Sequence, residues 1–152
     1  MGLVELSCSQ PGAVLAQSMV YFNDCKTNLL QSAYYVPSTA MLEPPITGSV
    51  NTNLGMRNYL NLYAVGDAQK TKVAFDLHRF TRSFLRGGTE LLRSSAEEIL
   101  LNGGADYDFP KDSYGIISVS SDTDGAGIFA NVLRVRLLEG GIVDFVMPTA
   151  LR

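Results

Sequence analysis

The chain has no tryptophan, one histidine (His78) and two cysteines, Cys8 and Cys25. The two cysteines lack a C-x-x-C spacing, and two thiols alone cannot form a structural zinc site. A buried thiol is the commonest state of such cysteines, and a disulfide between them is left open. No sequence feature pairs His78 with a carboxylate or a nucleophile. We therefore predict neither a metal nor a cofactor.

Charged residues are also scarce. They make up 18% of the chain, against a usual level of about 25%, and serine, threonine, asparagine and glycine supply the polar character instead. Uncharged polar side chains cost less to desolvate than charged ones, so this composition suits a surface partly covered by neighbours. The net charge of −3 and the pI near 5.0 argue against a dedicated nucleic-acid binder, which is usually strongly basic.

Long apolar runs are missing too. No stretch approaches the length that spans a bilayer, and the first residues show neither a basic region nor an apolar region of a secretory signal. We expect a protein made in the cytoplasm, without membrane contact. The length favours one domain over residues 1–152 that buries a core of its own.

Short strands separated by turn signals are predicted over most of the chain. The predicted strands are Leu3–Ser9, Ala13–Phe22, Leu29–Val36, Asn58–Val65, Tyr114–Ser121, Ile128–Leu138 and Ile142–Met147. The start of the second could instead begin a helix. The last two form a predicted hairpin around Glu139-Gly140-Gly141.

Residues 37–57 are predicted to form a long irregular loop, since three prolines and two glycines occur among serine, threonine and asparagine. Apolar residues such as Ile46 and Val50 are scattered through it, which is unusual for a flexible linker. The loop is expected to pack on something, either its own domain or a neighbouring subunit.

One segment, Val73–Gly104, has a helical period. Its apolar stripe comprises Val73, Leu77, Phe80 and Phe84 and continues in register to Leu92, Ala96 and Ile99. Gly87 and Gly88 interrupt it at a cost of roughly 2 kcal/mol in helix propensity. The segment is expected to be one kinked helix or two helices, with these glycines as the hinge.

The predicted fold class is therefore α+β: mostly antiparallel sheet, with one long or glycine-broken amphipathic helix packed across a face. On that helix, Arg79, Arg82, Arg86 and Arg93 would share the side opposite the apolar stripe. The row is either a solvated helix face or an electrostatic interface. Acidic residues after position 96 would complement it in head-to-tail association. Tyr59 and Tyr63 are further interface candidates, because subunit interfaces are rich in tyrosine.

Two short motifs fit their families poorly. Residues 125–130 match G-x-G-x-x-A, but a strand rather than a helix is predicted to follow, which favours a glycine-rich hairpin over a dinucleotide turn. Asp122-Thr123-Asp124-Gly125 resembles the start of a calcium loop, yet Leu133 stands where the loop needs a glutamate. We interpret it as a turn.

These observations favour a non-enzymatic, self-assembling structural protein. The specific prediction is a phage virion component, such as a capsid-associated, connector or tail protein. Its partners would be copies of itself and other assembly proteins, and not nucleic acid. A ligand-binding or partner-binding regulatory domain is the first alternative, and a small hydrolytic enzyme using His78 or Asp106 is the second.

Overall fold

The chain is built from antiparallel strands in this computed structural model, which describes residues 9, 17–23, 30–37, 45–79, 82–138 and 143–151. The strands are β1 (Gln17–Asn23), β2 (Leu30–Pro37), β3 (Ile46–Asn51), β4 (Arg57–Gly66), β5 (Lys70–Arg79), β6 (Arg82–Leu92), β7 (Ala96–Leu100), β8 (Tyr114–Ser120), β9 (Ala126–Leu137) and β10 (Val143–Ala150). The helical content of the described residues is one 3-10 turn, Asn53–Gly55. The described residues contain no helix that is long and apolar enough to cross a membrane.

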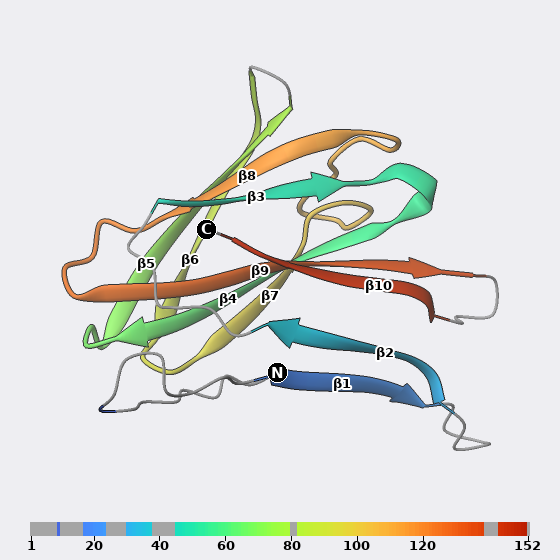
Figure 1. Cartoon of the computed structure of the whole chain (residues 1–152). Coiled ribbons are helices and arrows are strands. Elements are labelled where there is room, and N and C mark those ends of the chain that lie inside the picture. Colours follow the sequence, from blue (N-terminus) through green and yellow to red (C-terminus); the bar gives the residue numbers. More distant parts are fainter. Residues whose placement is uncertain are drawn as a thin grey trace.

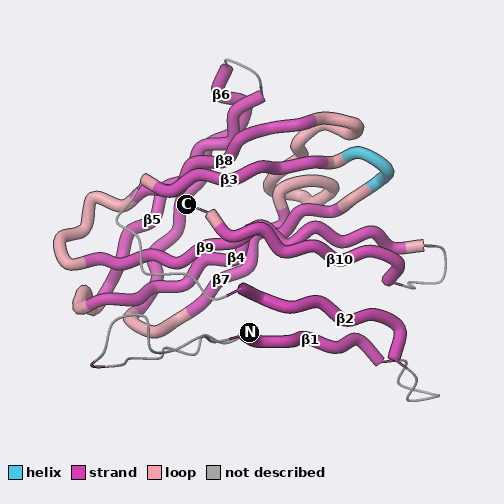
Figure 2. Tube along the Cα trace, in the orientation of Figure 1, coloured by secondary structure: helices cyan, strands magenta, loops and turns pink. Residues whose placement is uncertain are grey.

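Two four-stranded sheets make up the body of the molecule (Figure 1, Figure 2). One has the order β10-β9-β4-β7 and the other the order β3-β8-β5-β6, and all the neighbours in both are antiparallel. β1 and β2 pair with each other, and β2 lies alongside β10 (Figure 1). The arrangement is a β-sandwich with an added hairpin.

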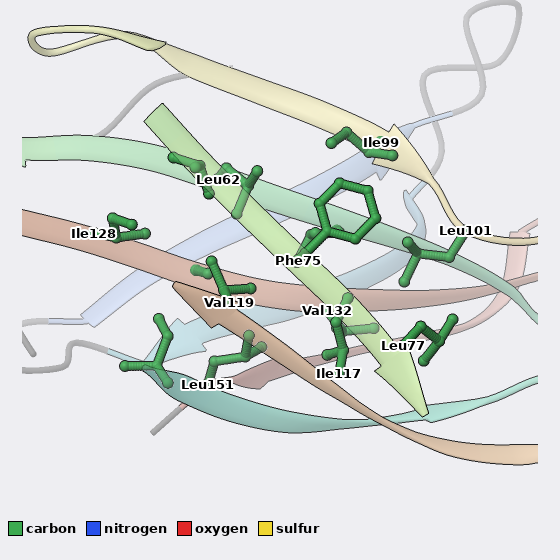
Figure 3. Close-up of a cluster of buried hydrophobic side chains, with 14 of the residues drawn as sticks. Leu62, Phe75, Leu77, Ile99, Leu101, Ile117, Val119, Ile128, Val132 and Leu151 are labelled. Carbon is green, nitrogen blue, oxygen red and sulfur yellow. The ribbon is translucent and has the colours of Figure 1, made fainter. Parts of the chain in front are cut away.

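The hydrophobic core lies between the two sheets (Figure 3). Each sheet contributes the alternate residues that point inward along its strands. Leu60 and Leu62 of β4 meet Phe75 and Leu77 of β5 in this way, and all four are at most 2% exposed. Other members of the core are Ile46, Val50, Val73, Leu91, Ile99, Leu101, Phe109, Ile117, Val119, Ile128, Val132 and Leu151.

The predicted α+β fold is wrong, because Val73–Gly104 forms β5, β6, β7 and their connections instead of an amphipathic helix. In β5 the exposed and buried residues alternate, with Val73, Phe75 and Leu77 buried. Val73 and Leu77 are four residues apart, a spacing that places two side chains on one face of a helix and equally on one face of a strand. The segment is a strand and not a helix because β5 pairs with β6 and β8.

Gly87 and Gly88 neither kink nor break a helix, since both lie within β6 opposite Phe75 and Ala74. A Cβ atom on Gly87 would lie 2.3 Å from Cζ of Phe75 and 2.6 Å from the hydroxyl oxygen of Tyr107. Those distances are far below van der Waals contact. Gly87 is therefore required by the packing of the Phe75 and Tyr107 rings, whose centroids are 5.4 Å apart.

The segment predicted as a loop at 37–57 contains β3 and the 3-10 turn. Ile46 and Val50 of β3 are buried in the core, so β3 packs on its own domain, and residues 38–44 lie outside the described residues. The predicted strands at Asn58–Val65, Tyr114–Ser121 and Ile128–Leu138 agree with β4, β8 and β9, and β10 pairs with β9 as a hairpin would. Leu3–Cys8, Cys25 and Glu139–Gly141 lie outside the described residues.

β9 is one of the two central strands of its sheet, paired with β4 on one side and β10 on the other. Its inward residues, such as Val132, belong to the core, and Asn131 and Leu133 on its opposite face are at most 9% exposed. Asn61 of β4 pairs in register with Asn131, and its Nδ2 donates a hydrogen bond of 2.9 Å to Oδ1 of Asn131. The middle of β9 is thus buried on both faces.

Candidate interaction surface around strand β6

β6 forms one edge of the β3-β8-β5-β6 sheet, with β5 as its neighbour. It has eleven residues, whereas the edge strands β3 and β7 have six and five. From Leu85 to Leu92 its register with β5 is regular, and the irregularity opposite Leu77 and His78 lies before this stretch. An edge strand carries a row of backbone N–H and C=O groups that another chain can pair with.

Charged side chains occupy the outer face of the β5–β6 hairpin, the face turned away from the core. Nε of Arg86 lies 2.9 Å from Oδ2 of Asp76, its neighbour across the strands. Nζ of Lys70 lies 2.9 Å from Oε1 of Glu90. The hydrogen bond and the charge of Lys70 lower the pKa of Glu90. These ion pairs are solvent-exposed, with 76% of the Arg86 side chain accessible, so they contribute little to stability.

A groove of about 390 Å³ opens beside β6 at Gly88. It is lined by Gly88 of β6, by Glu97, Glu98, Ile99 and Leu100 of β7, and by Gly104, Ala105, Asp106 and Tyr107 of the following loop. Its ionisable lining side chains are acidic apart from the Tyr107 phenol. Oε2 of Glu97 accepts a hydrogen bond of 2.5 Å from the Thr89 hydroxyl, which ties the β6 and β7 edges together.

The four predicted interface arginines do not form one row, because the helix face that would align them does not exist. Arg79 and Arg82 pair in register at one end of the β5–β6 hairpin, and the side chain of Arg82 lies outside the described part. Arg93 follows the other end of β6, where its Nη2 lies 3.5 Å from Oδ1 of Asp67. Arg86 lies between them on the outer face. Whether these residues form an interface remains a prediction.

Tyr59 and Tyr63 lie on β4, in the other sheet, and therefore on a different surface from Arg86. They project to the side of β4 away from the core. Tyr63 is 7% exposed and its ring centroid is 5.3 Å from that of Phe129. Tyr63 therefore contacts Phe129. Neither Tyr59 nor Tyr63 lies on the surface that carries Arg86.

His78 and Asp106, the residues of the predicted hydrolytic alternative, lie in different places. His78 is on the outer face of β5, with its Nε2 3.5 Å from Oδ2 of Asp76. Asp106 lines the groove, and His78 is not among the lining residues. The partnership of His78 with Asp76 was missed from the sequence. Its signal is the spacing of two residues, which places both side chains on one face of a strand.

The described residues contain no group of three or more histidine, cysteine, aspartate or glutamate side chains arranged to hold a metal ion. The Asp122–Gly125 segment is a turn in which the backbone nitrogen of Ala126 donates to the carbonyl oxygen of Thr123. Gly125 has a φ of +70°. β9 begins at Ala126, so the G-x-G-x-x-A sequence lies within a strand except for its first glycine, and not before a helix.

No family model matches this chain, and no curated protein matches it. Its fold is similar to the crystal structure of Thermotoga maritima 1070, with a TM-score of 0.50 over 71% of this chain and 88% of that chain. The identity is 13%, so the likeness concerns the fold alone.

Proposed function

We propose that this chain is a non-enzymatic, self-assembling structural protein that works through subunit–subunit contacts. The observation that carries this proposal is the open edge of β6. Natural proteins protect sheet edges with short strands, prolines, charged side chains, bulges or a covering segment. The charges of Arg86 and Glu90 on β6 are paired with Asp76 and Lys70 of β5. The regular stretch Leu85–Leu92 has eight residues without proline, and no other described strand pairs with its outer edge.

Exposed apolar residues on the same sheet support the proposal. Tyr114 and Ile116, two residues apart on one face of the central strand β8, are 62% and 57% exposed. Large apolar side chains on an open sheet face are typical of surfaces that contact another protein. The scarcity of charge in the whole sequence points the same way.

The more specific proposal, a phage virion component that meets other assembly proteins, rests on composition: few charges and many uncharged polar residues. Incorporation in a particle would follow synthesis in the cytoplasm.

Sedimentation velocity over a wide range of protein concentration tests self-assembly. We expect the weight-average mass to rise with concentration above that of one chain. A mass that stays at 16.5 kDa at the highest concentration would contradict the proposal.

A partner-binding regulatory domain is the second candidate, and the groove beside Gly88 is the observation that favours it. Its volume falls within the range of about 300–1,000 Å³ that is usual for ligand sites. Titration of the protein with short lysine-rich and glutamate-rich peptides, followed by amide NMR shifts of residues 97–107, tests this candidate. Absence of shifts with both peptides would remove it.

A further inference from the structure

The sequence of β6 is chemically symmetric about Gly88. Moving outward from this residue, Gly87 is matched by the small Thr89, Arg86 by Glu90, and Leu85 by Leu91. Each matched pair therefore consists of small, oppositely charged or apolar residues. A strand with this pattern is complementary to a second copy of itself in antiparallel orientation, because residues at equal distances from the centre then face each other.

We propose that β6 of one protomer pairs antiparallel with β6 of a second copy of this chain, with the two-fold axis at Gly88. The pairing joins two β3-β8-β5-β6 sheets into one continuous sheet of eight strands. This inference deepens the proposed self-assembly and rests on it. It names the partner, the strand and the register.

The outer face carries the charge complementarity. Within one chain, Asp76 is opposite Arg86 and Lys72 is opposite Glu90. In the paired sheet, Arg86 of one copy faces Glu90 of the other. Four adjacent strands then carry a row of alternating sign: Asp76 and Arg86 from one copy, Glu90 and Lys72 from the second. The two-fold axis generates the same row twice. Opposite charges directly across antiparallel strands stabilise the pairing, whereas like charges oppose it.

Other registers lose this complementarity. Moving the axis to Gly87 places Arg86 opposite Gly88, and moving it to Thr89 places Arg86 opposite Leu92. An axis lying between two residues, such as Gly87 and Gly88, would place outer-face residues of one copy opposite inner-face residues of the other, which a continuous sheet does not allow. Only the register centred on Gly88 pairs Arg86 with Glu90.

The centre of the proposed pairing is also sterically open. Gly88 is exposed and has no side chain, and the groove that it lines leaves room beside β6. Leu85 and Leu91 point toward the core side, where Leu91 is 3% exposed and Leu85 packs against the core. Facing each other across the axis, they extend the apolar layer from one protomer to the next.

Two charge-reversal variants, Arg86→Glu and Glu90→Arg, test the proposal. Each variant alone places like charges across the axis at two symmetric positions, and we expect its dimer dissociation constant to rise at least about tenfold. A mixture of the two variants restores opposite charges at both positions, since one copy then carries two glutamates and the other two arginines. Native mass spectrometry is expected to show the mixed dimer at a higher fraction than either self-pair.

Arg93→Glu and Asp124→Arg are matched controls, because they reverse the same charges in turns outside the pairing. Both are expected to dimerise as the parent does. Circular dichroism of every variant checks that the fold is retained.

The outcomes separate the two proposals. If the parent assembles and both β6 variants assemble equally well, or if their mixture shows no preference for the mixed dimer, the Gly88-centred pairing is overturned and self-assembly stands. A parent that stays monomeric at all concentrations overturns self-assembly itself, and the pairing with it.

Discussion

The side chain of Asn102 holds the backbone at the start of β4, because its Oδ1 accepts a hydrogen bond of 2.8 Å from the backbone nitrogen of Asn58. Asn58 is fully buried and Asn102 is 8% exposed. Nδ2 of Asn58 donates to the carbonyl oxygen of Asn51 at 2.8 Å, and Oδ1 of Asn58 accepts from the nitrogen of Asn51 at 3.2 Å. One buried amide network thus links the end of β3, the start of β4 and the loop after β7.

Asn58→Leu is expected to lower the free energy of unfolding by roughly 2–4 kcal/mol, since it leaves buried donors and acceptors without partners. Urea denaturation followed by circular dichroism measures the change. Asn53→Ala is the control, because Asn53 joins this network through its backbone nitrogen, which donates to Oδ1 of Asn51. Its effect is expected to stay within about 0.5 kcal/mol. Equal stability of the two variants would show that the network does not stabilise the fold.

Gly87→Ala is expected to destabilise the protein by about 1–3 kcal/mol, because the added methyl group overlaps the Phe75 ring. Gly104→Ala is the matched control. There the nearest atom to an added Cβ, Cδ2 of Leu100, is 3.4 Å away, an ordinary contact. Thermal unfolding of both variants tests this prediction, and an unchanged melting temperature for Gly87→Ala would contradict it.

Thr149→Val is expected to cost about 1.5–3 kcal/mol, since the Thr149 hydroxyl accepts a hydrogen bond of 2.6 Å from Nη2 of Arg134. Arg134 is 8% exposed, and burial lowers its pKa, although a guanidinium remains charged at neutral pH. Thr149→Ser keeps the acceptor and is expected to retain most of the stability. Chemical denaturation distinguishes the hydrogen bond from mere packing, because valine keeps the volume of threonine and serine keeps its oxygen.

Lys70→Met is expected to raise the pKa of Glu90 toward its ordinary value of 4.5, because the hydrogen bond and the charge of Lys70 lower it most. In the folded protein Lys70 lowers this pKa, so the ion pair contributes above pH 4.5 and is lost as the pH falls through the lower folded value. Carbon-13 NMR of the Glu90 carboxyl group measures both titrations. A pKa unaffected by the substitution would show that Lys70 and Glu90 do not interact in solution.

Most of the strands could be predicted from the sequence, since β4 alternates along Leu60, Leu62 and Ala64 and glycines mark the turns. The β5–β7 region could not. Spacings of four residues, as between Val73 and Leu77, fit a strand face and a helix face alike, and the decision comes from β8, whose residues lie about 40 positions further along the chain. The expected alignment of the four arginines on one helix face was wrong together with the helix, while their role in an interface stays a prediction. The sequence contains Arg86 and Glu90 at equal distances from Gly88, but this symmetry predicts strand pairing only once β6 is known to be an edge strand.

The position of β9 late in the sequence delays folding during synthesis. The hydrogen-bond partner of Asn61 is Asn131, 70 residues later, and the backbone nitrogen of Leu151 donates to the carbonyl oxygen of Ala130. During synthesis, β4 therefore emerges long before β9, one of its two neighbours in the sheet. Contacts of this range make folding slow. The chain is expected to complete its sandwich only after residue 151 has left the ribosome, and until then its nascent strands are substrates for chaperones.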